Sequence, residues 1–132
     1  MRKRGAGIVI KDNKIALIKR VKSYDIYYVF PGGGIEDLET PEEATIREVK
    51  EELGLEVQVN NLVYHDKKIG HYYFDCNVTG GVIGTGTGDE YKMDNGNRGI
   101  YEPLWVSLGA ILSIDLRPKK VARLVYSKYR MT

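Results

Sequence analysis

The chain has 132 residues, of which 42% are hydrophobic and 29% charged, the length and composition of one soluble domain, so we predict a single domain over residues 1–132. The net charge of +2 is too small to indicate a nucleic-acid partner or a membrane surface, and the apolar run near the N-terminus is too short for a signal peptide or anchor. One cysteine, Cys76, excludes an intrachain disulfide and favours a reducing, cytoplasmic location.

The first predicted elements are three strands. Apolar and β-branched residues over 6–10 and 15–18 flank a polar tetrapeptide in which Asp12 and Asn13 suit a turn, so they predict a β-hairpin. A third strand is predicted over 26–30. It runs into Pro31 and the glycines at 32–34, which are expected to end any regular element and which permit backbone angles closed to other residues.

A helix over about 41–53 has the strongest signals in the chain. Thr40 suits the N-cap, Pro41 suits the first helical position, and Glu43 completes a capping box. The helical run ATIREVKEEL then stops at Gly54, a residue typical of the position just beyond a helix C-terminus.

The rest of the chain predicts more strands, one long loop and two helices. Strands are expected over 57–64, 71–78 and 101–106, and the glycine-rich segment 80–99 is expected to include an irregular loop. Ser107 is expected to cap a short helix, and Pro118 to open a final helix to about Tyr129. This order of elements predicts an α/β fold, with helices packed on the faces of a mixed sheet.

Three carboxylates share one face of the helix over 41–53. At about 100° of rotation per residue, Glu48, Glu51 and Glu52 fall within one arc of roughly 100°. Like charges spaced three and four residues apart repel each other, so the pattern favours a site where a divalent cation binds between them. Mg²⁺ prefers such oxygen ligands. The opposite side of the helix carries the residues expected to face the core, Ile46, Val49 and Leu53.

The glycines before this helix belong to a longer motif. Gly33, Glu39 and the run REVKEELGL from Arg47 to Leu55 match the pattern G-x5-E-x7-R-E-U-x-E-E-x-G-U at every specified position and without a gap, where U is a bulky aliphatic residue. The segment resembles the Nudix box. The rest of the chain resembles Nudix hydrolases only in its length and its order of strands and helices.

The resemblance implies a Nudix fold, an α/β/α sandwich with a mixed β-sheet. It also implies an enzyme that hydrolyses the diphosphate linkage of a nucleoside diphosphate derivative. Glu51 and Glu52 correspond to metal ligands, and Glu48 to either a ligand or the general base. The Gly33 region corresponds to a backbone carbonyl ligand of the metal. The implied cofactor is Mg²⁺, with Mn²⁺ as a substitute.

The same resemblance assigns further roles around these glutamates. Arg47 is expected to orient them through charge-assisted hydrogen bonds, and Glu39 to support the site structurally. Glu90, in the glycine-rich loop, is the candidate for an additional acidic ligand or base. Asp94 and Glu102 are weaker candidates for that role.

Leu38 is a departure from the pattern of many relatives. They carry a Pro-Gly turn where this chain has Asp37 and Leu38. Because leucine adopts a positive φ at a greater cost than glycine, we expect the turn to differ in shape.

Several functions stay open at this point. The leading hypothesis is a MutT-like nucleoside triphosphate pyrophosphatase or a related small-nucleotide hydrolase. The alternatives are hydrolysis of diadenosine polyphosphates, ADP-ribose or nucleotide sugars. A hypothesis of another class is a Nudix-fold module that binds a nucleotide without cleaving it, although the intact glutamates argue against it. The expected partner is a small nucleotide, with neither a nucleic acid nor a membrane, and a homodimer is compatible with the sequence.

Overall fold

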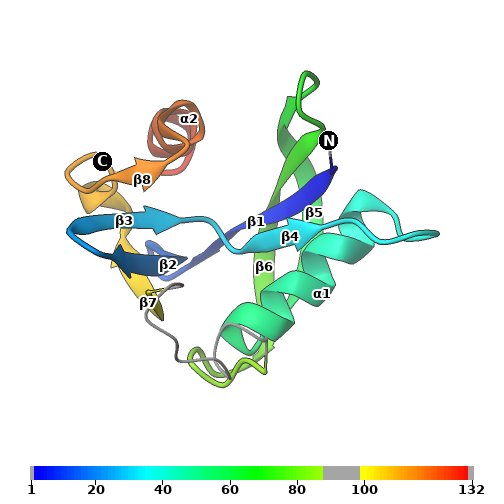
Figure 1. Cartoon of the computed structure of the whole chain (residues 1–132), viewed down its shortest axis with the longest axis horizontal. Helices are drawn as coiled ribbons and strands as arrows, with labels where there is room; N and C mark the ends of the chain where they lie inside the picture. The colour runs from blue at the N-terminus through cyan, green and yellow to red at the C-terminus, as the bar shows by residue number, and fades with distance from the viewer. Residues whose placement is uncertain (1, 88–98, 131–132) are drawn as a thin grey trace.

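The computed structural model describes residues 2–87 and 99–130 of the chain. Within these ranges the predicted strands and helices occur in the predicted order, together with two short strands that were not predicted (Figure 1). In chain order they are β1 (Arg4–Lys11), β2 (Lys14–Lys22), β3 (Asp25–Val29), β4 (Gly32–Gly34), α1 (Pro41–Leu53), β5 (Leu55–Asp66), β6 (His71–Gly81), β7 (Ile100–Ser107), the short 3-10 helix η2 (Leu108–Ala110), β8 (Leu116–Arg117) and α2 (Lys119–Tyr129).

Strand β1 joins the two halves of a mixed, curled sheet. Along its length β1 pairs in parallel with β6, and at its N-terminal end it also pairs antiparallel with β4. Its other end turns back into β2 through Asp12 and Asn13, which both have positive φ, as the predicted hairpin requires. Strand β2 then lies between β3 and β7, and β5 pairs with β6 at the far side. The sheet therefore opens as two wings from β1 (Figure 1).

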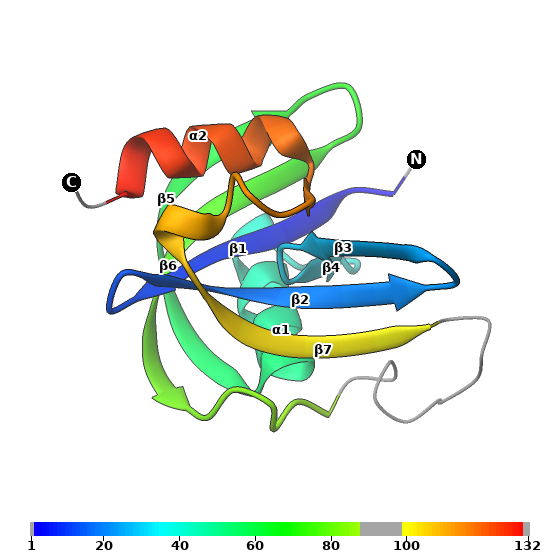
Figure 2. The same cartoon turned by 90° about the vertical axis from the view of Figure 1, so that its left-hand side faces the viewer.

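The two helices lie on opposite sides of this sheet, as Figure 2 shows. Alternate residues of β2 separate two cores: Ile15 and Leu17 pack with Val121 and Val125 of α2, whereas Ile18 packs on the α1 side. Helix α1 supplies Val49 and Leu53 to that second core. The predicted α/β/α sandwich with a mixed sheet is confirmed. No helix in the described ranges combines the length and apolar character that a membrane span needs.

Helix α1 begins and ends at the predicted residues. The Thr40 hydroxyl accepts from the Glu43 amide at 3.0 Å, Glu43 accepts from the Thr40 amide at 2.8 Å, and Gly54 has φ of 80°. The expected core face is partly wrong, because Ile46 is 40% exposed and Thr45 is buried in its place. A Cβ at Gly5 would approach the Thr45 hydroxyl to 2.7 Å, so this glycine allows the helix to pack closely on β1.

The three consecutive glycines form a strand, so the expectation that they end regular structure is wrong. Gly32, Gly33 and Gly34 pair with residues 4–6 of β1, and none of them adopts a positive φ. Space explains their presence: a Cβ at Gly32 would meet the Gly5 carbonyl at 2.6 Å. The left-handed conformation occurs instead at Leu38, with φ of 68°. The turn before α1 thus keeps a positive φ in spite of the leucine.

Two smaller differences concern the second half of the chain. Ser107 precedes η2, but its side chain makes no capping hydrogen bond, so the predicted cap is wrong. Strand β8 pairs with β3 and was not predicted from its short sequence. Cys76 is a buried free thiol on β6, and burial raises its pKa to about 12.

Candidate active site

The glutamate face of α1 lies directly against the glycine strand β4. The Gly32 amide donates to Oε1 of Glu52 at 2.7 Å, and the Glu52 side chain is almost completely buried. Next to it, a Cβ at Gly33 would overlap the Glu48 carboxylate. The missing side chain of Gly33 therefore creates the room that the Glu48 carboxylate occupies, and the Gly32 amide holds Glu52.

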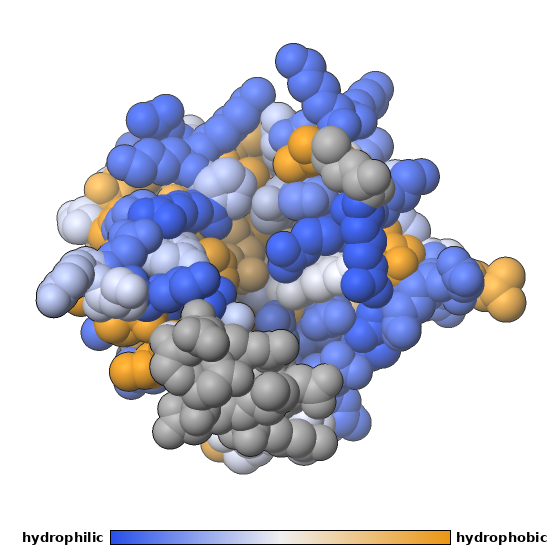
Figure 3. All heavy atoms as spheres, viewed as in Figure 1, coloured by the Kyte–Doolittle hydropathy of each residue, from blue (hydrophilic) through white to orange (hydrophobic). Residues whose placement is uncertain are grey.

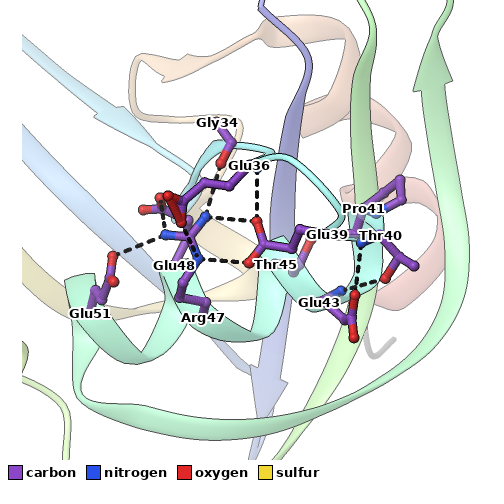
Figure 4. Close-up of polar contacts among 10 residues, drawn as sticks. All are labelled: Gly34, Glu36, Glu39, Thr40, Pro41, Glu43, Thr45, Arg47, Glu48 and Glu51. Atoms are coloured by element: carbon purple, nitrogen blue, oxygen red, sulfur yellow. Dashed lines mark hydrogen bonds and ion pairs between the residues drawn. The ribbon is translucent and has the colours of Figure 1, made fainter.

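Arg47 connects the helix to the turn before it (Figure 4). Its Nε and Nη2 donate to the two oxygens of Glu39 at 2.8 and 3.0 Å, which is a bidentate ion pair. Nη2 also donates to the Gly34 carbonyl at 2.9 Å. Because of this ion pair, the pKa of Glu39 falls to about 2, and the pKa of Arg47 lies above its usual value.

The same guanidinium contacts two of the three clustered glutamates. Nη1 of Arg47 donates to Oε2 of Glu48 at 2.9 Å and to Oε2 of Glu51 at 3.3 Å. Burial raises the pKa of Glu48, and the positive charges of Arg47 and Arg4 oppose that shift. The neighbouring carboxylates are thus held by one shared cation rather than by separate basic partners on the helix.

The donor set at this face has the chemistry that a hard cation requires. It consists of the carboxylates of Glu48, Glu51 and Glu52 on one face of α1 and the backbone of Gly33, against which the Glu48 carboxylate packs. Among residues 2–87 and 99–130, no three acidic, histidine or cysteine side chains converge closely enough to hold an ion in this conformation. Glu48 and Glu51 are instead turned toward Arg47, and Glu52 toward Gly32.

The structure therefore brings together the residues that the motif singled out on α1 and β4, Gly33, Arg47, Glu48, Glu51 and Glu52. Glu90, and with it Asp94, falls in the segment 88–98 outside the described residues. Glu102 lies on β7, paired with Lys19 of β2 in the other wing of the sheet.

A cavity of about 370 Å³ lies on the opposite side of β1 and β4 from these glutamates. Figure 3 shows a hollow with an apolar floor between the wing that carries α2 and the β5–β6 hairpin. Phe30 and Tyr73 meet edge to face in its wall, with ring centroids 5.8 Å apart. The apolar and aromatic lining comes from five elements (β1, β3, β5, β6 and α2) and from the links between elements; its residues are Ala6, Val29, Phe30, Tyr64, Ile69, Tyr72, Tyr73, Pro118 and Val121.

Charged side chains border the same cavity. Arg117 is held by Asp115 at 2.8 Å and lies over the ring of Tyr27, 4.1 Å from its centroid. Lys120 lies 5.1 Å from the centre of the Tyr64 ring. Arg4 extends from the start of β1 and donates to the Gly32 carbonyl at 3.1 Å. No sequence spacing pointed to this cavity, because its residues meet only through the fold.

Comparisons with known proteins agree with this architecture. The family model described as NUDIX domain matches residues 1–125. Among curated relatives, the ADP-ribose pyrophosphatase of Methanocaldococcus jannaschii is 50% identical over 58 residues, 43% of this chain and 34% of that protein. The 8-oxo-dGTP diphosphatase of Proteus vulgaris is 36% identical over 77 residues, 56% of this chain and 66% of that protein. These matches thus span about a third and just under two thirds of the two relatives.

The fold itself is shared over nearly the whole chain. A solved MutT structure, from work on the enzymes of Aliivibrio salmonicida and Vibrio cholerae, superposes with a TM-score of 0.69 at 22% identity, covering 97% of this chain and 98% of that one. An ADP-ribose pyrophosphatase from Streptococcus suis superposes with a TM-score of 0.67 at 17% identity, covering 99% and 96%. With a family model that matches residues 1–125 and an intact motif on α1 and β4, the chain belongs to the Nudix family.

Proposed function

We propose that this protein is a divalent-metal-dependent hydrolase that cleaves the diphosphate linkage of a nucleoside diphosphate derivative. The observation that carries this proposal is the packing of Glu48 and Glu52 against the glycines of β4, with Arg47 holding Glu48 and Glu51 together. A merely solvated acidic helix face needs neither the buried Glu52 nor the shared guanidinium. The similar pyrophosphatases and diphosphatases support the same reaction class.

The proposed cation is Mg²⁺, with Mn²⁺ as a substitute, held by Glu51, Glu52, the Gly33 backbone and, in one of its two proposed roles, Glu48. When bound, the cation supplies charge neutralisation for a diphosphate and activation of water. Arg47 keeps the carboxylates oriented through its contacts with Glu48 and Glu51, and its bidentate pair with Glu39 fixes the guanidinium itself.

Glu48 and Glu90 are the two candidates for the general base. Burial makes the Glu48 carboxylate more basic than an exposed glutamate, which suits the acceptance of a proton from water. Its Oε2 is hydrogen-bonded to Arg47, which leaves that oxygen a weaker proton acceptor than the other. Glu90 is proposed from its place in the glycine-rich loop alone, and Glu90→Gln is expected to lower activity less than Glu52→Gln.

The cavity on the other side of β4 supports a nucleoside as the recognised part of the substrate. Its volume of about 370 Å³ is within the range of small-ligand sites, and its aromatic lining suits a stacked base. The buried free thiol of Cys76 fits the cytoplasmic location that we propose for such an enzyme.

The proposal is tested by measuring phosphate and nucleotide release with Mg²⁺, with Mn²⁺ and with EDTA. The substrates are nucleoside triphosphates (8-oxo-dGTP included), diadenosine polyphosphates, ADP-ribose and nucleotide sugars. We expect cleavage of one class, its loss in EDTA, and a decrease of roughly 10²–10³-fold in Glu52→Gln, because the metal contributes several kcal/mol to the transition state. An unchanged thermal unfolding midpoint controls for the fold of the variant.

A nucleotide-binding module without turnover is the competing function. Metal-independent nucleotide binding with no cleavage of any substrate class would establish that function and overturn the proposed one. Near-wild-type turnover in Glu52→Gln would remove this glutamate from the metal site.

A further inference from the structure

Arg4 occupies the boundary between the glutamates of α1 and the cavity. It lines the cavity, and its Nη2 donates to the Gly32 carbonyl at 3.1 Å, while the Gly32 amide donates to Glu52 at 2.7 Å. One residue of β4 thus contacts Arg4 through its carbonyl and the glutamate cluster through its amide. The backbone of Arg4 is fixed as well, because its amide donates to the Gly70 carbonyl at 3.0 Å.

The charge of Arg4 acts on titratable groups of the cavity. It opposes the burial-driven rise in the pKa of Tyr73, and together with burial it lowers the pKa of His71. His71 is therefore disfavoured as a cation here, and Arg4 supplies the permanent positive charge of this part of the cavity.

The guanidinium of Arg4 is available to a ligand. The residue is exposed, and none of the ion pairs between described residues includes it. Arg117 differs, since it is paired with Asp115 and Asp25, and Lys120 lies over the Tyr64 ring. Beyond the bond to Gly32, the guanidinium N–H groups of Arg4 make no hydrogen bond within the described part of the chain. A guanidinium with unused donors matches the geometry of phosphate oxygens.

We propose that Arg4 binds the phosphate group nearest the nucleoside, at the point where the substrate passes from the cavity over β4 to the glutamates of α1. Arg4 is then a positioning residue that selects nucleotides over nucleosides and sets which part of the phosphate chain reaches Glu52. This inference rests on the proposed function for the direction of the phosphate chain. Its test does not depend on turnover.

The experiment measures binding in EDTA, without catalysis, by calorimetry. The ligands are AMP, GMP, CMP and UMP and the corresponding nucleosides, and the proteins are wild type, Arg4→Gln, Arg4→Lys and the control Arg123→Gln. Arg123 is an exposed cation of α2 outside the cavity lining, so its removal changes the net charge equally. The thermal unfolding midpoint is recorded for each variant.

We expect Arg4→Gln to weaken binding of the preferred monophosphate by about 10- to 100-fold, the range for hydrogen bonds between charged groups. Binding of the nucleoside is expected to stay within about twofold, Arg4→Lys to retain part of the affinity by its charge, and Arg123→Gln to resemble wild type. A folded Arg4→Gln that binds the monophosphate like wild type would overturn the inference. Equal losses for nucleoside and monophosphate, or no binding of any monophosphate to wild type, would overturn it too.

The two proposals fail in distinguishable ways. If wild type cleaves a nucleotide and Arg4→Gln keeps its monophosphate affinity, only the role of Arg4 is wrong. If the phosphate-specific loss is observed but no substrate is cleaved, Arg4 binds the phosphate in a nucleotide-binding module, and only the proposed hydrolase activity is wrong.

Discussion

The glutamate site and the cavity lie on either side of β4 and are built in contrasting ways. The site comes from one continuous segment, Gly33 to Leu55, whose side chains contact one another, as Arg47 contacts Glu39, Glu48 and Glu51. The cavity is assembled from strands, a helix and a link that are far apart in the sequence. The proposed reaction chemistry is thus encoded locally, whereas the proposed recognition of a nucleoside depends on how distant elements meet.

The substitution Arg47→Lys is expected to disrupt the glutamate site most strongly while it leaves every proposed metal ligand in place. Lysine cannot replace the bidentate pair with Glu39 and also contact Glu48 and Glu51. We expect kcat/KM to fall by about 10- to 100-fold, with weaker metal binding, as for other residues that orient ligands. Steady-state kinetics over a range of Mg²⁺ concentrations measures this. The control, Lys50→Gln, changes an exposed cation of the same helix, and equal losses in both variants would contradict the role of Arg47.

A change in the cavity is expected to affect KM more than kcat. Tyr64→Ala removes a ring from the cavity wall, where it lies 6.3 Å from the Tyr73 ring. We expect KM to rise about tenfold with a smaller change in kcat, because stacking on a base contributes about 1–3 kcal/mol. Tyr24→Ala, at a fully exposed tyrosine, is the control. A fall in kcat with an unchanged KM would argue against a binding role for the cavity.

The stability of the glutamate site is expected to depend on pH through Glu39. Because its pKa is lowered to about 2 in the folded protein from about 4.5, the ion pair with Arg47 stabilises the fold above pH 4.5 and is lost as the pH falls toward 2. We expect Glu39→Gln to lower the free energy of unfolding by about 1–2 kcal/mol at pH 7 and by almost nothing near pH 2. Denaturant titrations at several pH values test this, with Asp37→Asn as the control. A difference that does not change with pH would refute the ion-pair explanation.

The smallest effect is expected at Leu38, within the same segment. Its φ of 68° costs a leucine about 1–2 kcal/mol of folding free energy. Glycine would avoid this cost, but the larger conformational entropy of its unfolded chain would offset part of the gain. Since the side chain is fully exposed, no packing is lost. We expect Leu38→Gly to raise the free energy of unfolding by about 0.5–1 kcal/mol, measured by urea titration. Leu38→Ala keeps the unfavourable φ, so its free energy of unfolding is expected to change little. If Leu38→Ala were stabilised as much as Leu38→Gly, relief of the positive φ would not be the cause.

The same contrast explains what could be predicted from the sequence. Helix α1 follows from its capping box and Gly54, and the hairpin between β1 and β2 from Asp12 and Asn13, because these are local signals. Local signals also placed the glutamates on one face. They failed for the glycines of β4, where the reason for glycine is the approach of Glu48 and of β1. They failed for the cavity too, since Tyr64, Tyr73 and Arg4 have no spacing that links them.

The buried thiol on β6 makes this protein convenient for site-specific labelling. Cys76 is the single cysteine of the chain, and with its pKa raised to about 12 it contains almost no reactive thiolate at neutral pH. A cysteine introduced at an exposed position, for example Lys68→Cys in the turn between β5 and β6, would therefore react alone with a maleimide dye. A fluorophore there would stand close to the cavity, which Asp66 and Ile69 line, and could test the proposed nucleotide binding by its change in emission.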